Sequence, residues 1–532
     1  MRCRLRLRGR YWGDSMFRMC RPLAFLAGSL ASGAMLATVA EAQTVPSWQR
    51  SLSSKVVAID TTAFGSMLVL SKSGLLAVDP ESGRDRWTRP DVSDYQMITG
   101  TPYAVFTTST GQVIAEIESG TDVWKFSGLG LSAVKDVIHL PAAGVVLAAG
   151  PSPQSPHTLV AAEYRTGQIL WTQTALFKEP ALAANAAKVR YRRNLLDSEQ
   201  SVILDPSHDG LMRLDLRSGQ LLWRIPEAML ASKGKWVDLF QAGDHLLVAY
   251  DKKLFSINRA DGKVEWARAA GFPSPLFQAS QVRKGLLVRG GYNTNNKGRM
   301  SWKPYLALLD PATGASRWTT EKTRFDGRSA YLVEEDTVTV ALKDGVSAFD
   351  IDSGKPVLTH AMPEFGGGEH ACCLERTDEG RLLVWSSQNL RMLAPSGKLE
   401  YSVFLKAPGA SFMAKLGTIA LLAAATAGSY AMAPPGGLYT VFGPGSDSPL
   451  TAKFRASTDA ERYLYVFTED AGTAPDRFAL VRLDKDTGKD TGRVKFTQRS
   501  PLFRLEPGTS VVVAADEARL YGVRFPGTGG RR

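Results

Sequence analysis

Seven of the eleven tryptophans in this 532-residue chain stand four residues after a glycine, and six of these pairs recur along the chain at intervals of 37 to 52 residues. Random placement of 49 glycines and 11 tryptophans would give about one such pair. Repeats of about 40–50 residues in a strand-rich sequence indicate the blades of a β-propeller. The six pairs are Gly83/Trp87, Gly120/Trp124, Gly167/Trp171, Gly219/Trp223, Gly262/Trp266 and Gly314/Trp318. Three further copies replace the tryptophan with another bulky apolar residue: Gly354/Leu358, Gly397/Tyr401 and Gly492/Phe496.

The residues before each glycine also repeat, and they predict a strand, a turn and a second strand. Apolar alternation such as Leu76 and Val78 is typical of a half-buried strand. The residue four before the glycine can accept hydrogen bonds from the turn, and the glycine adopts the positive φ that the turn requires. The tryptophan then begins the outermost strand and buries its ring against the next blade. The acceptors are Asp79, Glu116, Glu163, Asp215, Asn258, Asp310 and Asp350.

The pattern A-x-D-x-x-T-G-x-x-x-W resembles the pyrroloquinoline-quinone (PQQ)-type repeat. That repeat occurs in quinoprotein dehydrogenases and in a non-enzymatic propeller lipoprotein that serves outer-membrane barrel assembly. The resemblance is clear over residues 55–401 and weaker over 454–525, and it implies a ring of eight blades. The landmarks number nine, and residues 500–525 read as inner strands of one more. We therefore expect an all-β, single propeller of about eight four-stranded blades, with a sequence count that allows up to ten.

The two ends of the repeat region are expected to share one blade. The stretch 500–525 lacks an outer strand of its own, and Trp48 marks an isolated outer strand near the start. Pairing of these segments would close the ring.

Residues 1–42 have the three parts of a secretory signal peptide. Arg18 and Arg21 precede an apolar stretch over 22–39, and Ala40-Glu41-Ala42 is a cleavage motif before Gln43. The true start is Met16, or else the charged region is unusually long; an uncleaved anchor helix is the alternative. The chain is therefore expected to be exported to the periplasm or the extracellular space, with membrane association left open.

An apolar insertion over 411–437 separates the propeller blades of 43–410 from the final blades and ring closure of 438–532. Its centre, Leu416 to Ala433, contains no charge, but it is short and weakly apolar for a membrane span. A crossing would also separate the last blades from the rest. We therefore favour a helical or hairpin excursion that contacts the propeller, a partner or a membrane surface; a buried helix and a spanning helix are the alternatives.

The adjacent pair Cys372-Cys373 follows Glu369 and His370 and is the most unusual local motif. A vicinal disulfide occurs in quinoprotein alcohol dehydrogenases, but early in their propeller, so the role is not transferred. Two thiols or a structural ring are the simpler interpretations. Neighbouring residues rarely complete a metal site without distant ligands, so no metal is expected.

Other motifs give no catalytic constellation. The six histidines (139, 157, 208, 245, 360 and 370) are scattered, and C-x-x-C-H is absent, which excludes attached c-type haem. Asp350 and Asp352 lie inside a repeat turn and are expected to cap it rather than to bind calcium. The basic stretch Lys188 to Arg193 and the loop Gly290 to Lys303 are candidate binding loops or solvated faces.

Net charge is +12, part of it in the leader, and is too dilute to indicate nucleic-acid binding. The preferred hypothesis is an exported, non-enzymatic scaffold that binds protein or envelope components, acts as a monomer and needs no cofactor. The alternative is a quinoprotein dehydrogenase that uses PQQ and calcium. No catalytic or metal-binding residue is assigned, and cofactor-binding residues are left unknown.

Overall fold

A computed structural model describes residues 46–98, 100–174, 176, 191–206, 210–230, 237–250, 253–269, 276–293, 302–320, 331–342, 344–369, 371, 373–386, 388–406, 462–469, 478–496, 501–506 and 511–525. All of them belong to one compact unit, Gln43–Arg532. The predicted leader, the insertion at 411–437, His208, His370 and Cys372 lie outside the described residues, so the predictions about them stand as predictions.

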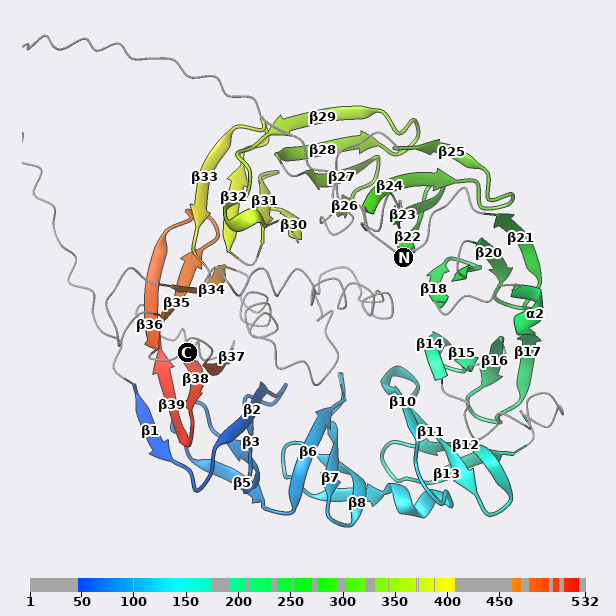
Figure 1. Cartoon of the computed structure of the whole chain (residues 1–532), viewed down its shortest axis with the longest axis vertical. Helices are drawn as coiled ribbons and strands as arrows, with labels where there is room; N and C mark the ends of the chain where they lie inside the picture. Colours follow the sequence, from blue (N-terminus) through cyan, green and yellow to red (C-terminus); the bar gives the residue numbers. More distant parts are fainter. Residues whose placement is uncertain are drawn as a thin grey trace, which may run out of the picture. The chain divides into compact units, whose positions relative to one another are not determined.

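Ten antiparallel sheets follow one another along the chain, and we number them as blades 1 to 10 (Figure 1). The first five blades each contain four strands. They are blade 1, β2 (Val56–Thr61), β3 (Met67–Ser71), β4 (Gly74–Val78) and β5 (Asp85–Arg89); blade 2, β6 (Val92–Met97), β7 (Tyr103–Thr108), β8 (Gly111–Glu116) and β9 (Asp122–Lys125); blade 3, β10 (Asp136–Leu140), β11 (Val145–Ser152), β12 (Ser155–Glu163) and β13 (Ile169–Gln173); blade 4, β14 (Tyr191–Ser198), β15 (Ser201–Pro206), β16 (Leu211–Asp215) and β17 (Leu221–Ile225); and blade 5, β18 (Val237–Ala242), β19 (His245–Tyr250), β20 (Lys253–Asn258) and β21 (Val264–Ala269).

The second half repeats this order, with three described strands in blade 9. They are blade 6, β22 (Leu276–Val282), β23 (Gly285–Asn293), β24 (Trp302–Leu309) and β25 (Ser316–Thr319); blade 7, β26 (Tyr331–Val333), β27 (Thr337–Leu342), β28 (Gly345–Asp350) and β29 (Pro356–Ala361); blade 8, β30 (Cys373–Arg376), β31 (Leu382–Trp385), β32 (Asn389–Leu393) and β33 (Leu399–Phe404); blade 9, β34 (Tyr463–Glu469), β35 (Phe478–Asp484) and β36 (Asp490–Phe496); and blade 10, β37 (Leu502–Glu506), β38 (Val511–Asp516), β39 (Arg519–Arg524) and β1 (Trp48–Ser51).

Helix is nearly absent from the described residues. It is limited to the short helix α2 (Glu227–Leu230) and the 3-10 turns η1 (Phe126–Leu129), η2 (Pro141–Ala143) and η4 (Gly366–Gly368). The all-β prediction is therefore confirmed. The described residues form ten blades, so the expectation of about eight, which came from the family resemblance, is wrong; the sequence landmarks plus the tail gave the correct number.

Blade 10 is built from both ends of the described chain. Strand β1 pairs antiparallel with β39, with Trp48 opposite Gly522 and Ser51 opposite Arg519. This confirms the predicted ring closure, and Figure 1 shows β1 beside β39. Because the ring is closed, no blade is left at an end with an uncovered face. This matters because one blade cannot cover both of its own faces.

Each tryptophan packs on the turn of the next blade, as the repeat predicts. At seven consecutive blade-to-blade contacts, here called seams, the indole ring lies on a glycine whose φ is between 65° and 74°. The seven indole N–H groups also donate to a backbone carbonyl of that turn, over 2.7 to 3.0 Å. The seven pairs are Trp48/Gly83, Trp87/Gly120, Trp124/Gly167, Trp171/Gly219, Trp223/Gly262, Trp266/Gly314 and Trp318/Gly354.

The remaining seams use other side chains, and two sequence landmarks are corrected here. Leu358 occupies the register position of the tryptophan but is exposed, and the ring of His360 packs on Gly397 in its place. Tyr401 packs on Gly488, not on Gly492, because Gly488 adopts the positive φ (66°) and its N–H donates to Asp484 O. Gly492 instead lies on the outer strand β36, opposite Arg482.

Blade 9 therefore has no side chain at the tryptophan position, and it packs on blade 10 in another way. The buried Arg482 guanidinium lies 5.1 Å from the ring centre of Phe525. The rings of Phe467 and Phe503 lie 5.9 Å apart across the same seam. Blade 10 has no turn between its third and outer strands, because its outer strand comes from the start of the chain. A tryptophan in blade 9 would thus have no glycine turn to cover.

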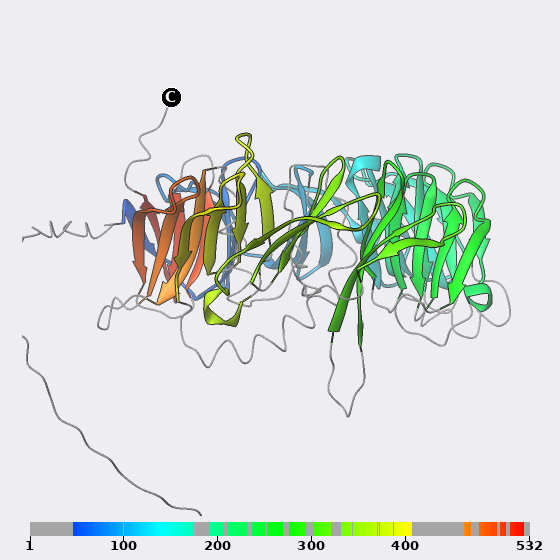
Figure 2. The same cartoon turned by 90° about the horizontal axis from the view of Figure 1, so that it is seen from above.

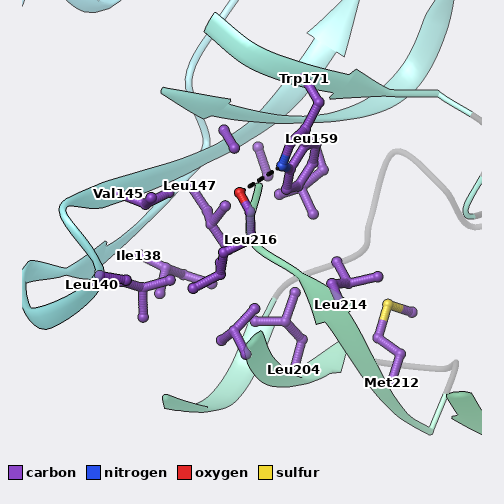
Figure 3. Close-up of a cluster of buried hydrophobic side chains, with 14 residues drawn as sticks. Ile138, Leu140, Val145, Leu147, Leu159, Trp171, Leu204, Met212, Leu214 and Leu216 are labelled. Carbon is purple, nitrogen blue, oxygen red and sulfur yellow. Dashed lines mark hydrogen bonds between the residues drawn. The ribbon is translucent and has the colours of Figure 1, made fainter. Parts of the chain in front are cut away.

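The hydrophobic core is divided among the seams. Figure 3 shows the cluster between blades 3 and 4, where Leu147, Leu159 and Trp171 meet Leu204 and Leu214. The two central strands of a blade are almost wholly buried, whereas the outer strands alternate, as β4 and β5 show. This pattern follows from stacking, since both faces of each inner sheet are covered by neighbouring blades. Figure 2 gives the view from above.

Among the described residues, no helix is long and apolar enough to cross a membrane.

Candidate functional site

Charged side chains of the described residues gather at the seams. Most interblade ion pairs are at least partly exposed, so each contributes roughly 0–1 kcal/mol to stability. They join neighbouring blades around the ring. The side chains in these pairs are therefore less free to bind a ligand or to act as acids or bases. The pairs include Arg50/Asp85, Lys55/Glu517, Arg89/Asp122, Arg259/Asp197, Arg283/Asp336, Lys284/Asp352, Arg376/Glu334, Arg381/Asp486, Lys485/Glu375, Arg504/Asp60 and Arg524/Glu81.

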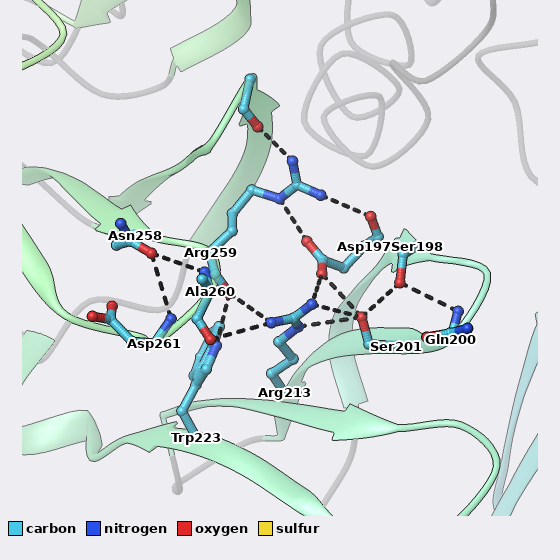
Figure 4. A network of polar contacts seen from close by, with 11 residues as sticks. Asp197, Ser198, Gln200, Ser201, Arg213, Trp223, Asn258, Arg259, Ala260 and Asp261 are labelled. Atoms are coloured by element: carbon cyan, nitrogen blue, oxygen red, sulfur yellow. Dashed lines mark hydrogen bonds and ion pairs between the residues drawn. The ribbon is translucent and has the colours of Figure 1, made fainter.

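The most buried of these charges is Asp197, at the end of the inner strand β14 of blade 4 (Figure 4). Its side chain is 1% exposed and lies between two guanidinium groups. Arg213 Nη2 of the same blade and Arg259 Nε of blade 5 each lie 2.6 Å from a carboxylate oxygen. Ser201 Oγ donates to the same carboxylate over 3.0 Å. All partners of this carboxylate are cations or donors, so the network has the character of a structural clasp between two blades.

A shallow, open groove lies at the rim of blades 3 and 4. Its volume is about 400 Å³. We call it the rim groove, and its lining residues are Ala142, Ala143, Glu199, Gln200, Asp215 and Arg217. They come from turns that share one side of the ring, because in a four-stranded antiparallel blade the first and third turns lie on the same side.

The rim groove carries both signs of charge. Hydrogen bonds from the Ser218 hydroxyl and N–H to Asp215 hold the pKa of that carboxyl below its ordinary value. Asp215 is therefore ionised at neutral pH. Arg217 reaches across the seam and donates to Ala143 O over 3.3 Å. The groove can thus offer a fixed carboxylate and a guanidinium to polar side chains of a ligand or partner.

Apolar residues at the start of the outer strands of the same two blades are exposed. Ile169 of β13 is 41% exposed, and Leu221 and Leu222 of β17 are 39% and 42% exposed. These residues follow directly on the third turns, so they lie on the same side of the ring as the rim groove. Exposed apolar side chains beside a polar rim are typical of a protein-binding surface.

The histidines are distributed among separate contacts, as the sequence indicates. His139 Nδ1 lies 2.6 Å from Tyr164 Oη, and burial lowers the pKa of His139 to about 4. His157 Nε2 lies 3.1 Å from Tyr191 Oη. His245 Nδ1 lies 2.7 Å from a carboxylate oxygen of Glu265, and His360 packs on Gly397. These four do not converge on one site.

The motif around the cysteine pair is only partly described. Cys373 begins the inner strand β30 and is buried, at 5% exposure. Glu369 is held by the next hairpin, since Gln388 N and Asn389 Nδ2 donate to it over 3.0 and 3.2 Å. That environment stabilises the carboxylate as a hydrogen-bond acceptor within blade 8. A disulfide between Cys372 and Cys373 remains a prediction.

The other sequence candidates have structural partners. Asp350 caps its own turn, because Oδ1 accepts from Ser353 N over 2.7 Å, whereas Asp352 pairs with Lys284 of blade 6. This confirms the predicted capping role of Asp350. Of the basic stretch 188–193, residues 191–193 begin β14, and the rest lies outside the described residues. The loop 290–303 is described only at its two ends, in β23 and β24.

The dehydrogenase alternative requires a bound calcium ion. A hard cation needs several oxygen ligands gathered in one place. Within the described part of the chain, no three His, Cys, Asp or Glu side chains are grouped so that they could hold a metal ion. The inner-strand carboxylate Asp60 illustrates why, since Arg504 Nε lies 3.1 Å from it and Tyr95 Oη donates to it over 2.9 Å.

Sequence reasoning found the turns and missed the rim groove and the Asp197 network. The acid, glycine and tryptophan of a turn lie within nine residues of one another, so their pattern can be recognised in the sequence. Asp197 and Arg259 are separated by 62 residues, and nothing local marks them as partners. Only their shared place next to repeat turns could have suggested the contact.

The fold and its turns define this chain as a β-propeller of ten blades with PQQ-like repeats. Within it, residues 109–291, from the turn before β8 to β23, match the family model described as outer membrane protein assembly factor BamB. The resemblance inferred from the repeats is thereby confirmed for that region.

Solved structures similar to the chain include a BamB protein and two dehydrogenases. BamB from Moraxella catarrhalis is 15% identical, covers 64% of this chain and 95% of its own, and has a TM-score of 0.32. Quinohemoprotein alcohol dehydrogenase from Comamonas testosteroni is 13% identical, with coverage of 65% and 72% and a TM-score of 0.32. Dihydro-heme d1 dehydrogenase NirN is 14% identical, with coverage of 72% and 70% and a TM-score of 0.33. No curated protein sequence matches the chain.

Proposed function

We propose that the protein is a non-enzymatic scaffold of the cell envelope that binds a partner protein at the rim of blades 3 and 4. The observation that carries the proposal is the combination of exposed Ile169, Leu221 and Leu222 with the charged rim groove beside them. The apolar side chains supply area to bury, and Asp215 and Arg217 supply polar complementarity. The match to the assembly-factor family, residues 109–291, includes this rim.

The interblade ion pairs also support a scaffold. Charges that pair across a seam are engaged by their partners, as Asp197 is by two guanidinium groups. Export through the predicted signal peptide at residues 1–42 would place the scaffold in the envelope. The proposal includes no quinone and no metal.

The contribution of the rim is tested by affinity capture from envelope extracts with the protein as bait. The variant Leu221→Lys/Leu222→Lys places charges at two exposed positions and is expected to lose the captured partner while its unfolding midpoint is unchanged. Thr88→Lys on β5 is the matched control, because Thr88 is also exposed on an outer strand. Equal capture by both variants would exclude this rim as the binding surface.

The dehydrogenase alternative is tested with the purified protein, PQQ and Ca²⁺. Absorbance above 300 nm, thermal shift and dye reduction with simple alcohols and sugars are followed together. The scaffold proposal predicts no saturable shift and no turnover. A saturable shift with turnover would make the protein an oxidoreductase and overturn the proposal.

A further inference from the structure

The outer strand of blade 7, β29, differs from the other outer strands in charge and exposure. Its sequence, PVLTHA, contains no Asp, Glu, Lys or Arg; among the described outer strands only β13 shares this property. Five of its six residues are exposed, and Val357 reaches 58%. Charged residues on an edge strand normally prevent pairing with another chain. In β29 that protection is missing.

The exposure of β29 arises from the altered seam beside it. In the other complete blades an aromatic residue stands at the register position of Leu358 and packs on the next blade. In β29 this packing is made by His360, two residues further on, and Leu358 is 43% exposed. The apolar side chains of Val357 and Leu358 are therefore left at the outer edge.

The backbone of β29 also offers hydrogen-bonding groups along this edge. Met362 N donates to Asp344 O of the blade, and the register pairs His360 with Val346 and Thr359 with Ser347. Because backbone groups point alternately to the two sides of a strand, those of Thr359 and Ala361 are directed away from β28. Among the strands that the structure describes, β29 pairs with β28 alone.

We propose that β29 is a self-association edge, and that its occupant is β29 of a second copy of this chain in antiparallel pairing about Thr359. Thr359 then faces its own copy, a favourable cross-strand pair, and Leu358 faces His360 of the second copy. No like charges meet, since neither strand carries a charged residue. This edge is distinct from the rim of blades 3 and 4, and the inference departs from the expectation of a monomer.

The dimer is expected to be weak. One strand edge buries less than the roughly 1,200 Å² that is typical of stable complexes. Sedimentation-equilibrium analysis of the purified chain should therefore show a concentration-dependent mixture of monomer and dimer.

Charge variants at the centre of the pairing test the proposal. Thr359→Lys and Thr359→Glu each place like charges opposite one another, and each should weaken dimerisation about two- to fivefold. An equimolar mixture of the two variants should restore association, because Lys then faces Glu. Thr88→Lys is the matched control: Thr88 occupies the same position, five residues after the turn glycine, on β5.

Several results would overturn the proposal. These are a wild-type chain that stays monomeric at all concentrations, unchanged association of both Thr359 variants, or an equal effect of Thr88→Lys. Restoration by the mixture is a readout that misfolding of either variant could not produce. Cross-linking of Thr359 to a different protein, with a monomeric wild type, would assign the edge to another partner and would also overturn it.

Discussion

At the scale of single residues, the turn glycine is the most constrained position in each blade. Gly219 combines a φ of 70° with the Trp171 ring, which a Cβ at this position would approach to 2.5 Å. Either feature alone disfavours a larger residue, and together they explain why the glycine and the tryptophan recur as a pair. The indole N–H bond to Leu216 O fixes the ring on the turn.

Gly219→Ala is therefore expected to destabilise the protein by about 2 kcal/mol or more, from backbone strain and overpacking together. Gly65→Ala is the matched control, because its φ is 66° and a Cβ there meets nothing within 4 Å. That variant should lose only about 1 kcal/mol, from strain alone. Urea unfolding measures both; equal losses would show that the Trp171 contact has no part in the constraint.

His139 should give the stability of the protein a dependence on mildly acidic pH. Burial lowers its pKa from 6.5 to about 4, so below pH 6.5 the unfolded chain takes up a proton that the folded chain does not. Stability therefore falls as pH drops from 6.5 to about 4, by about 3 kcal/mol in total. His139→Gln should flatten this part of the profile in urea unfolding at several pH values. An unchanged profile would contradict the assignment.

At the scale of elements, the seams are the units of stability, and their polar parts behave differently from their apolar parts. The Asp197 carboxylate is buried between Arg213 and Arg259, so removing it leaves two cations facing each other without a counter-ion. By contrast, replacing all three with apolar residues removes the charges together.

Asp197→Ala is expected to cost about 3–5 kcal/mol, as for other buried charges that lose a partner. The triple variant Asp197→Leu/Arg213→Met/Arg259→Met should lose clearly less than the single variant. Chemical denaturation at neutral pH compares them. A triple variant that is less stable than Asp197→Ala would mean that the network contributes net stability rather than only balancing its own charges.

The seams also show how far sequence reasoning extends. The turn acid, the glycine and the tryptophan lie close together along the chain, and the sequence predicts their roles in seven seams. Trp48 also predicts ring closure. In blades 7 and 9 the sequence pattern gives the wrong residues. Leu358 and Phe496 keep the spacing of the repeat, but His360 makes the ring contact in blade 7 and Gly488 is the turn glycine of blade 9. The rim groove and the Asp197 network bring together distant segments, so their geometry emerges only from the assembled ring.

At the scale of the whole molecule, the ten described blades form a ring that one short strand closes. Strand β1 is four residues long and joins blade 10 through β39, while Trp48 packs on Gly83 of blade 1. The number of described blades differs from the eight that the resemblance implies, although each unit keeps the repeat's turn or strand order.

Removal of β1 should thus open the ring at blade 10. A chain lacking residues 46–52 is expected to unfold at lower temperature, and β37 to β39 should become sensitive to protease, because their sheet loses its outer strand. Trp48→Phe is the control, since it keeps β1 and an apolar ring on Gly83. Protection of residues 501–525 from protease in the shortened chain would show that closure does not depend on β1.

Site-specific photo-cross-linking in the producing cell shows whether the rim of blades 3 and 4 binds a partner protein. A photoreactive amino acid replaces Ile169, Leu222 or, as the control, Thr88; all three are exposed on outer strands. If the rim binds a partner, positions 169 and 222 give one discrete protein adduct and position 88 gives none. The absence of adducts at 169 and 222, or the same adducts at all three positions, would contradict partner binding at the rim.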